Sequence, residues 1–153
     1  MRILILLFLL LSPVYGHAAD AVALDSSVFV EREVPAAGGK TVTVLEEPKV
    51  VIPGDRLVFI LQYRNTGTQS AKDFVVTNPM PAPVAYQGTS DTVAQVSVDG
   101  GRTFAPLASL IIREPDGADR AARPEDVTHV RWHLREPIAA GAQGKLSFRG
   151  VVR

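Results

Sequence analysis

The sequence contains no cysteine and a single tryptophan, and its positive and negative charges cancel. Without cysteine the chain has no disulfide, no cysteine nucleophile and no N-terminal cysteine for lipid attachment. The 16 Lys and Arg residues equal the 16 Asp and Glu residues in number, and the basic residues are scattered along the chain. Because nucleic-acid binding needs a continuous basic surface, we expect no nucleic-acid partner.

Segments with helical periodicity are also lacking. The 12 glycines and 11 prolines recur throughout the sequence, and the stretches between them are short, alternating and rich in β-branched residues. This pattern is typical of an all-β sandwich or barrel and not of βαβ units. A chain of 153 residues is expected to form one domain. No second copy of the pattern appears, so we expect one unit and not a repeat array.

The N-terminus differs from the rest of the chain. Residues 3–11 are nine consecutive apolar residues after a basic start, and a Ser-Pro step and several small residues follow. This order predicts a secretory signal peptide that is cleaved after Ala18, with Gly16 and Ala21 as alternative sites. An uncleaved anchor is disfavoured because crossing a bilayer takes about 20 apolar residues. We therefore expect an exported protein, without a membrane span after processing, in the periplasm, on the outer membrane surface or outside the cell.

We expect residues 1–18 to be the signal peptide, residues 19–27 to be a flexible N-terminal segment, and residues 28–153 to form a β-sandwich of about eight or nine strands. The expected strands cover residues 28–34, 41–45, 56–65, 74–77, 84–88, 93–98, 103–107, 127–134 and 145–152, with 110–113 as a continuation. Residues 114–126 are expected to form a polar loop.

The strongest of these strands, residues 56–65, has apolar side chains on both faces in its first half. This is typical of a central strand, which is covered on both sides. Glycine, proline, asparagine and aspartate on either side of it favour tight turns. The structural turns are expected at Pro53, Gly54, Asp55, Asn65 and Gly67.

The order of these turns and strands resembles a known family, the conserved-repeat domain catalogued as domain of unknown function eleven. The resemblance spans roughly residues 45–153. It implies an immunoglobulin-like sandwich of bacterial surface and secreted proteins, and it offers no catalytic residues. The chain departs from the family in being a single copy without cysteine and in an insertion around residues 88–126. The matching residues are Pro53, Gly54, Asp55, Asn65, Thr66, Gly67, Ala71, Val75, Val76, Thr77, Pro79, Pro81, Tyr86, Trp132, Ile138, Gly141, Leu146 and Phe148.

A second motif, Ser97, Asp99, Gly101, Thr103 and Phe104, resembles the Asp-box of sialidases and other secreted proteins. Its residues have the chemistry of a hairpin turn, because an aspartate accepts hydrogen bonds from turn N–H groups and a glycine adopts positive φ. We therefore interpret it as a structural hairpin. Membership of a glycosidase family is the alternative, and it is disfavoured because the motif occurs once in a chain too short for a propeller.

Candidate catalytic and metal-binding groups are sparse. The adjacent carboxylates at residues 46–47 and 125–126 point to opposite faces if they lie on strands, so neither pair suits glycoside hydrolysis. His129 and His133 are separated by about 13 Å if the segment is a strand, so one ion cannot bridge them. We expect no catalytic residue, no metal site and no cofactor.

The leading hypothesis is a non-catalytic binding or structural module of the bacterial cell envelope that acts through sheet edges and loops. Strand addition at an exposed edge suits such a domain, and residues 20–27 are the candidate strand. The other candidate contacts are the proline-rich edge at 79–81, the loop at 114–126, and a basic face formed by Arg131 and Arg135. The partner is expected to be a protein or another envelope component.

The alternative hypothesis is a glycan-binding or glycan-active secreted protein. It is motivated by the Asp-box and by Trp132, which is either a platform for a sugar or a core residue. Trp132 shares a face with Val130 and Leu134, so we interpret it as core. A periplasmic chaperone of the immunoglobulin type is a third hypothesis, weakened because such proteins have two domains.

Overall fold

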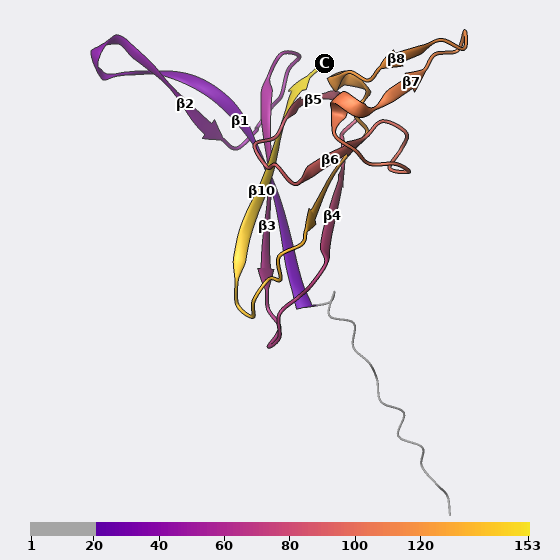
Figure 1. The fold of residues 1–153 in the computed structure, drawn as a ribbon. Coiled ribbons are helices and arrows are strands. Elements are labelled where there is room, and N and C mark those ends of the chain that lie inside the picture. The colour runs from indigo at the N-terminus through magenta and orange to yellow at the C-terminus, as the bar shows by residue number, and fades with distance from the viewer. Residues whose placement is uncertain (1–20) are drawn as a thin grey trace, which may run out of the picture.

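The computed structural model describes residues 21–153, which form an all-β fold (Figure 1). The expected signal peptide and its cleavage at Ala18 lie outside the described residues. The strands are β1 (Val22–Ala36), β2 (Lys40–Glu46), β3 (Arg56–Asn65), β4 (Phe74–Pro79), β5 (Val84–Gly88), β6 (Ala94–Ser97), β7 (Ile111–Arg113), β8 (Asp119–Ala121), β9 (His129–Leu134) and β10 (Gln143–Val152). Single turns of 3₁₀ helix are η2 (Ala37–Gly39), η3 (Leu107–Ser109) and η4 (Pro124–Asp126).

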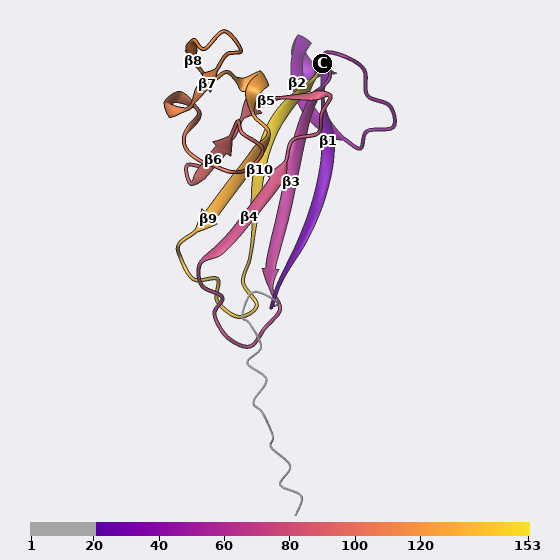
Figure 2. The same ribbon diagram turned by 90° about the vertical axis from the view of Figure 1, so that its right-hand side faces the viewer.

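The strands form an antiparallel sandwich, as expected. One sheet has five strands in the order β2-β1-β3-β10-β5, and the other has three in the order β4-β9-β6. The short strands β7 and β8 form a separate ribbon. The two main sheets face each other, with β4 and β9 beside β3 and β10 (Figure 2). Strand β3 lies at the centre of the larger sheet, and both Leu57 on its inner face and Val58 on its outer face are buried.

The core lies between these two sheets and is built around Phe148 of β10, whose side chain is fully buried. Its ring stacks on Phe59 of β3 with the centroids 4.5 Å apart, and it also contacts Tyr86 and Trp132. Trp132 of β9 is likewise fully buried. Aromatic side chains bury large apolar areas, so this cluster contributes much of the stabilisation that joins the sheets.

The strand boundaries correct three expectations. The sandwich begins at residue 22 and not at 28, because residues 22–30 pair with β3 along its whole length. Residues 22–27 are therefore neither a flexible segment nor a free strand for donation. Residues 103–107 contribute a single bridge instead of a strand. The expected polar loop at 114–126 contains β8 and η4, which brings the total to ten strands.

Two ribbons project from the same end of the sandwich, as Figure 1 shows. One is the part of β1 beyond Val30 together with β2, and we call residues 31–46 the arm. The other is the ribbon of β7 and β8. The C-terminus lies at this end too. Within residues 21–153, no helix has the length and apolar character that crossing a bilayer requires.

Candidate interaction surface

The turn at Asp99 is a tightly bonded hairpin connection. One carboxylate oxygen accepts hydrogen bonds from the N–H groups of Arg102 and Thr103 at 3.0 Å and from the Ser97 hydroxyl at 2.7 Å. The other accepts the Thr103 hydroxyl at 2.6 Å. These bonds lower the pKa of Asp99, Thr103 first among them. The imidazole of His129 lies against Gly101. All these groups bond within the turn, so the geometry is that of a structural hairpin.

Asn65 joins two loops at the end of the sandwich away from the arm. Its buried side-chain amide donates to the carbonyls of Gln69 and Ile138 at 2.7 and 2.8 Å, and its oxygen accepts the N–H of Gly67 at 2.9 Å. The backbones of Ala71 and Ile138 exchange hydrogen bonds beside it. The expected turn residues of the two loops therefore meet in one place, where their role is structural.

Asp55 ties the preceding turn to the root of the arm. Its carboxylate accepts from the guanidinium of Arg32 at 2.6 Å and from the N–H of Ile52 at 3.0 Å. These two donors hold the pKa of Asp55 below its ordinary value. The backbone of the same turn bonds to Val152 at the end of β10. The turn at residues 53–55 thus fixes the place where the arm leaves the sheet.

The opposite face of the arm's root carries a second set of ion pairs. Glu31 accepts a hydrogen bond from Arg149 of β10 at 2.9 Å and lies 3.4 Å from Arg56 of β3. Neighbouring residues of a strand point to opposite faces, so Glu31 and Arg32 hold the root from both sides. The direction of the arm is therefore set by the sandwich.

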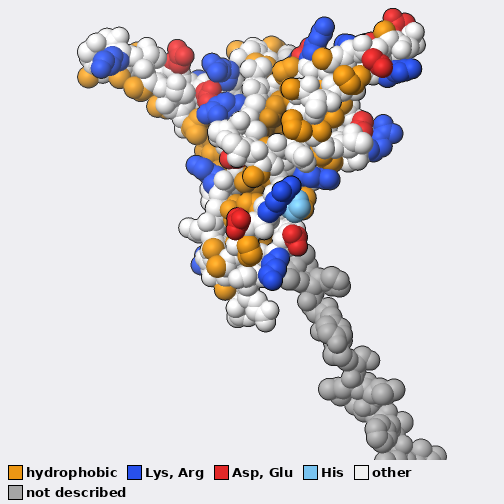
Figure 3. All heavy atoms as spheres, viewed as in Figure 1, with side chains coloured by type: hydrophobic (Ala, Val, Ile, Leu, Met, Phe, Trp, Pro, Cys, Tyr) orange, Lys and Arg blue, Asp and Glu red, His pale blue; other side chains and the backbone are white. Residues whose placement is uncertain are grey.

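Beyond its root the arm is exposed. Strand β2 pairs only with β1 among the described strands, so its other edge is free. Val42 is 46% exposed and Leu45 is 47% exposed. Figure 3 shows hydrophobic side chains along the arm together with basic and acidic ones. A sheet edge with unpaired N–H and C=O groups is a template for another strand.

An apolar groove opens beside the arm. It has a volume of about 380 Å³ and lies between the loop before β3 and the proline-rich step before β5. Val50 is 75% exposed and Ile52 next to the groove is 59% exposed. Contiguous apolar surface on a soluble domain marks a site of interaction. The lining residues are Val28, Pro48, Lys49, Val50, Val51, Leu57, Phe59, Pro81, Pro83 and Val84.

Arg131 and Arg135, which were expected to form one basic face, have different surroundings in the structure. The guanidinium of Arg131 lies over the ring of Phe104, 3.5 Å from its centroid, and its Nε donates to the Thr77 hydroxyl. Arg135 is exposed and lies beyond the end of β9, beside His133 in a small hollow. Arg131 is therefore committed to contacts within the domain, and only Arg135 of the two is open to a partner.

Another hollow, with polar side chains among its lining residues, has a volume of about 640 Å³. We call it the polar hollow. It lies over three neighbouring strands, β1, β3 and β10, at the end away from the arm. Trp132 is absent from it, because its side chain is buried in the core. The lining residues are Ala23, Leu24, Asp25, Gln62, Tyr63, Arg64, Gln143, Gly144 and Lys145.

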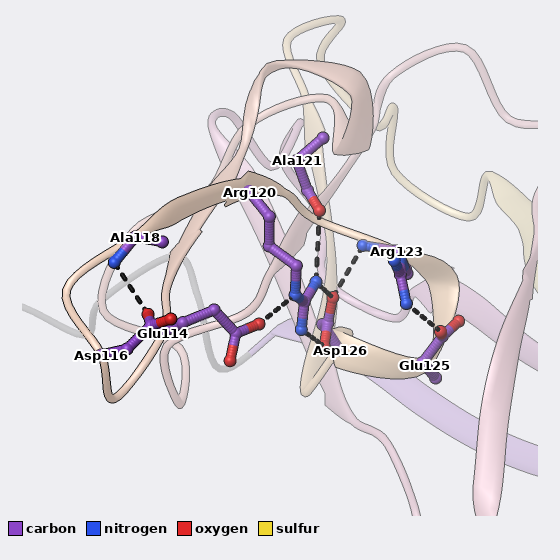
Figure 4. A network of polar contacts seen from close by, with 8 residues as sticks. All are labelled: Glu114, Asp116, Ala118, Arg120, Ala121, Arg123, Glu125 and Asp126. Atoms are coloured by element: carbon purple, nitrogen blue, oxygen red, sulfur yellow. Dashed lines mark hydrogen bonds and ion pairs between the residues drawn. The ribbon is translucent and has the colours of Figure 1, made fainter.

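The β7–β8 ribbon is held at its base by Arg120 (Figure 4). The guanidinium of Arg120 binds both carboxylate oxygens of Asp126 at 2.5 and 2.8 Å and also pairs with Glu114. Arg120 lowers the pKa of Asp126 to about 2. Asp126 also accepts the N–H of Arg123 at the start of η4. The network joins the ribbon to the turn that leads into β9.

Side chains that could hold a metal ion do not cluster in the part of the chain that the structure describes. Across residues 21–153, no three His, Cys, Asp or Glu side chains come together as a metal site would require. The carboxylates at residues 125 and 126 are separated into different contacts, with Arg123 and Arg120 respectively.

The hairpin that forms the arm was predicted as strands at 28–34 and 41–45, and β1 and β2 pair as expected. Its projection from the sandwich and the groove were not predicted, although the Val-Val-Ile run at 50–52 points to the groove in retrospect. Comparison of the chain with protein-family models, curated proteins and solved structures gave no match. The resemblance to the conserved-repeat domain therefore stays a prediction.

Proposed function

We propose that the protein is a non-catalytic binding module of the bacterial cell envelope, exported through its N-terminal signal and acting through its sheet edges and loops. The observation that supports this proposal most strongly is the apolar groove. The groove is flanked by Val50 and Ile52, which expose large apolar side chains to water. Burial of such side chains by a partner is favourable, at about 25 cal/mol per Å² of apolar surface.

The groove suits an extended segment of a partner protein. Its walls are two loops that contain prolines, and its floor is made by Leu57 and Phe59 from the inner face of β3. A partner side chain that enters it reaches the end of the core between the sheets.

Capture experiments with matched variants test this proposal. The chain is immobilised and exposed to an envelope extract, and retained proteins are compared between Val50→Asp and Val75→Asp. Val75 lies on β4, outside the groove, and is 47% exposed, so it controls for an added surface charge. We expect one envelope protein to be retained by the parent and by Val75→Asp and lost from Val50→Asp. Equal retention by all three would contradict a role for the groove.

Glycan binding is the second candidate, and the polar hollow supports it. Asp25, Gln62 and Arg64 point to one face there, together with Gln143 and Lys145 on the next strand. Such donors and acceptors suit sugar hydroxyls. Binding on a glycan array that is lost in Gln62→Ala but kept in Val50→Asp would favour this function over protein binding.

A further inference from the structure

We infer that the free edge of β2 is the contact through which two copies of this chain pair, antiparallel, about a two-fold axis at Thr43. This inference goes beyond the proposed function, because it names the occupant of one edge and does not depend on the partner of the groove. It stands on the sequence of β2, on its position at the edge of the sheet, and on the projection of the arm away from the sandwich (Figure 1).

The strand is complementary to itself in charge. In an antiparallel pair centred on Thr43, residues whose numbers sum to 86 lie opposite each other. Lys40 of one copy then faces Glu46 of the other, and the reverse pair forms at the far end. Opposite charges directly across an antiparallel pair are stabilising. One two-fold contact therefore contains two complementary pairs.

Other arrangements of the same two strands lose this match. In a parallel, in-register pair Lys40 faces Lys40 and Glu46 faces Glu46, and like charges opposite each other are destabilising. A shift of the antiparallel register by two residues leaves Lys40 opposite an apolar residue or beyond the strand. Charges at the ends of an edge strand normally oppose association. Of these arrangements, only the centred antiparallel pair places both Lys40 residues opposite Glu46.

The apolar residues match in the same register. Val42 of one copy faces Val44 of the other, and Thr43 faces Thr43. Val42 and Val44 lie on the face of the arm that also carries Val34, as the pairing of β1 with β2 shows. This face continues the inner face of the sheet from Val30, which is in the core. The pairing therefore brings Val42, which is exposed in a single copy, against Val44 of the other copy.

The shape of the molecule permits the contact. The arm extends clear of the sandwich, and its root is fixed on both faces by Arg32–Asp55 and Glu31–Arg149. In Figure 1 the arm projects on the side away from β4 and β6, so the three-stranded sheet does not cover β2. Such a dimer has one continuous sheet through both copies. A two-fold contact of this kind is closed and does not grow into a fibre.

Charge reversal tests the inference. The protein is recovered from cells that express the full sequence, and its mass is measured by light scattering over a range of concentrations. We expect a dimer for the parent. Lys40→Glu and Glu46→Lys should each weaken dimerisation by about tenfold or more, because each converts two attractive pairs into repulsive ones. Lys72→Glu makes the same charge change in the loop before β4 and should leave the dimer unchanged.

Variants that restore the opposite-charge pairs distinguish a loss of pairing from damage to the arm. The double variant Lys40→Glu with Glu46→Lys restores both opposite-charge pairs, as does an equal mixture of the two single variants. We expect both samples to dimerise like the parent. A parent that stays monomeric, single variants that dimerise unchanged, a double variant that stays monomeric, or assemblies larger than a dimer would each overturn the inference. Circular dichroism checks that every variant is folded.

Discussion

Removal of the Asn65 amide should destabilise the domain, because this residue at the end of β3 joins two loops. The side chain is fully buried and makes three hydrogen bonds, to Gln69, Ile138 and Gly67. Each bond contributes about 1 kcal/mol net, so Asn65→Ala should cost up to about 3 kcal/mol. In the variant, the carbonyl of Ile138 still accepts a hydrogen bond from the N–H of Ala71, and the carbonyl of Gln69 can accept one from water, because Gln69 is exposed. The loss of free energy of unfolding is therefore expected to be at least about 2 kcal/mol.

Urea unfolding of the two proteins measures this difference directly. Asn78→Ala is the matched control, because the amide of Asn78 makes one exposed bond to its neighbour Pro79, and we expect a change within about 0.5 kcal/mol. Asn65→Asp should lose at least as much as Asn65→Ala, since a carboxylate cannot donate to the two carbonyls. A loss below about 1 kcal/mol in Asn65→Ala would refute the view that this residue joins the two loops.

Two further predictions concern acid and packing. Arg120 holds the pKa of Asp126 at about 2, so the stability from this contact is full above about pH 4 and is lost as the pH falls toward 2. Urea titrations at several pH values should therefore show that Asp126→Asn loses less stability than the parent between pH 5 and 2.5. Asp116→Asn is the control and should follow the parent, because the amide oxygen of Asn can accept the one backbone hydrogen bond that Asp116 accepts. In Gly150→Ala the new methyl would meet the side chain of Val84 and lie 3.1 Å from the Ala85 carbonyl, so we expect a loss of about 1–3 kcal/mol. Adding Val84→Ala should make the combined loss smaller than the sum of the two, and strict additivity would contradict the proposed clash.

The sequence was informative where a strand has apolar residues on both faces and turn residues at both ends. The bounds of β3 were predicted without error, because the proline, glycine and aspartate before it and the asparagine after it define both of its ends. The burial of Trp132 was also predicted, since the residue shares a period-two face with Val130 and Leu134. In both cases neighbours along the chain decide the outcome.

Long-range contacts decided what the sequence did not predict. Residues 22–27 alternate weakly, and they are a strand because β3 offers them a free edge. Strand β8 is three residues long and is held by the side chain of Arg120. The groove depends on how two loops approach each other, at Val50 and at Pro81. None of these long-range contacts produces a periodic pattern in the sequence.

Photo-crosslinking in cells determines whether the protein contacts its partner through the surface beside the arm. A photoreactive residue is placed at Val50 in the groove or at Val75 on β4, and the full chain is expressed with either one. We expect a crosslinked adduct with another envelope protein from position 50 and none from position 75. Adducts of equal yield from both positions, or an adduct from position 75 alone, would contradict this expectation.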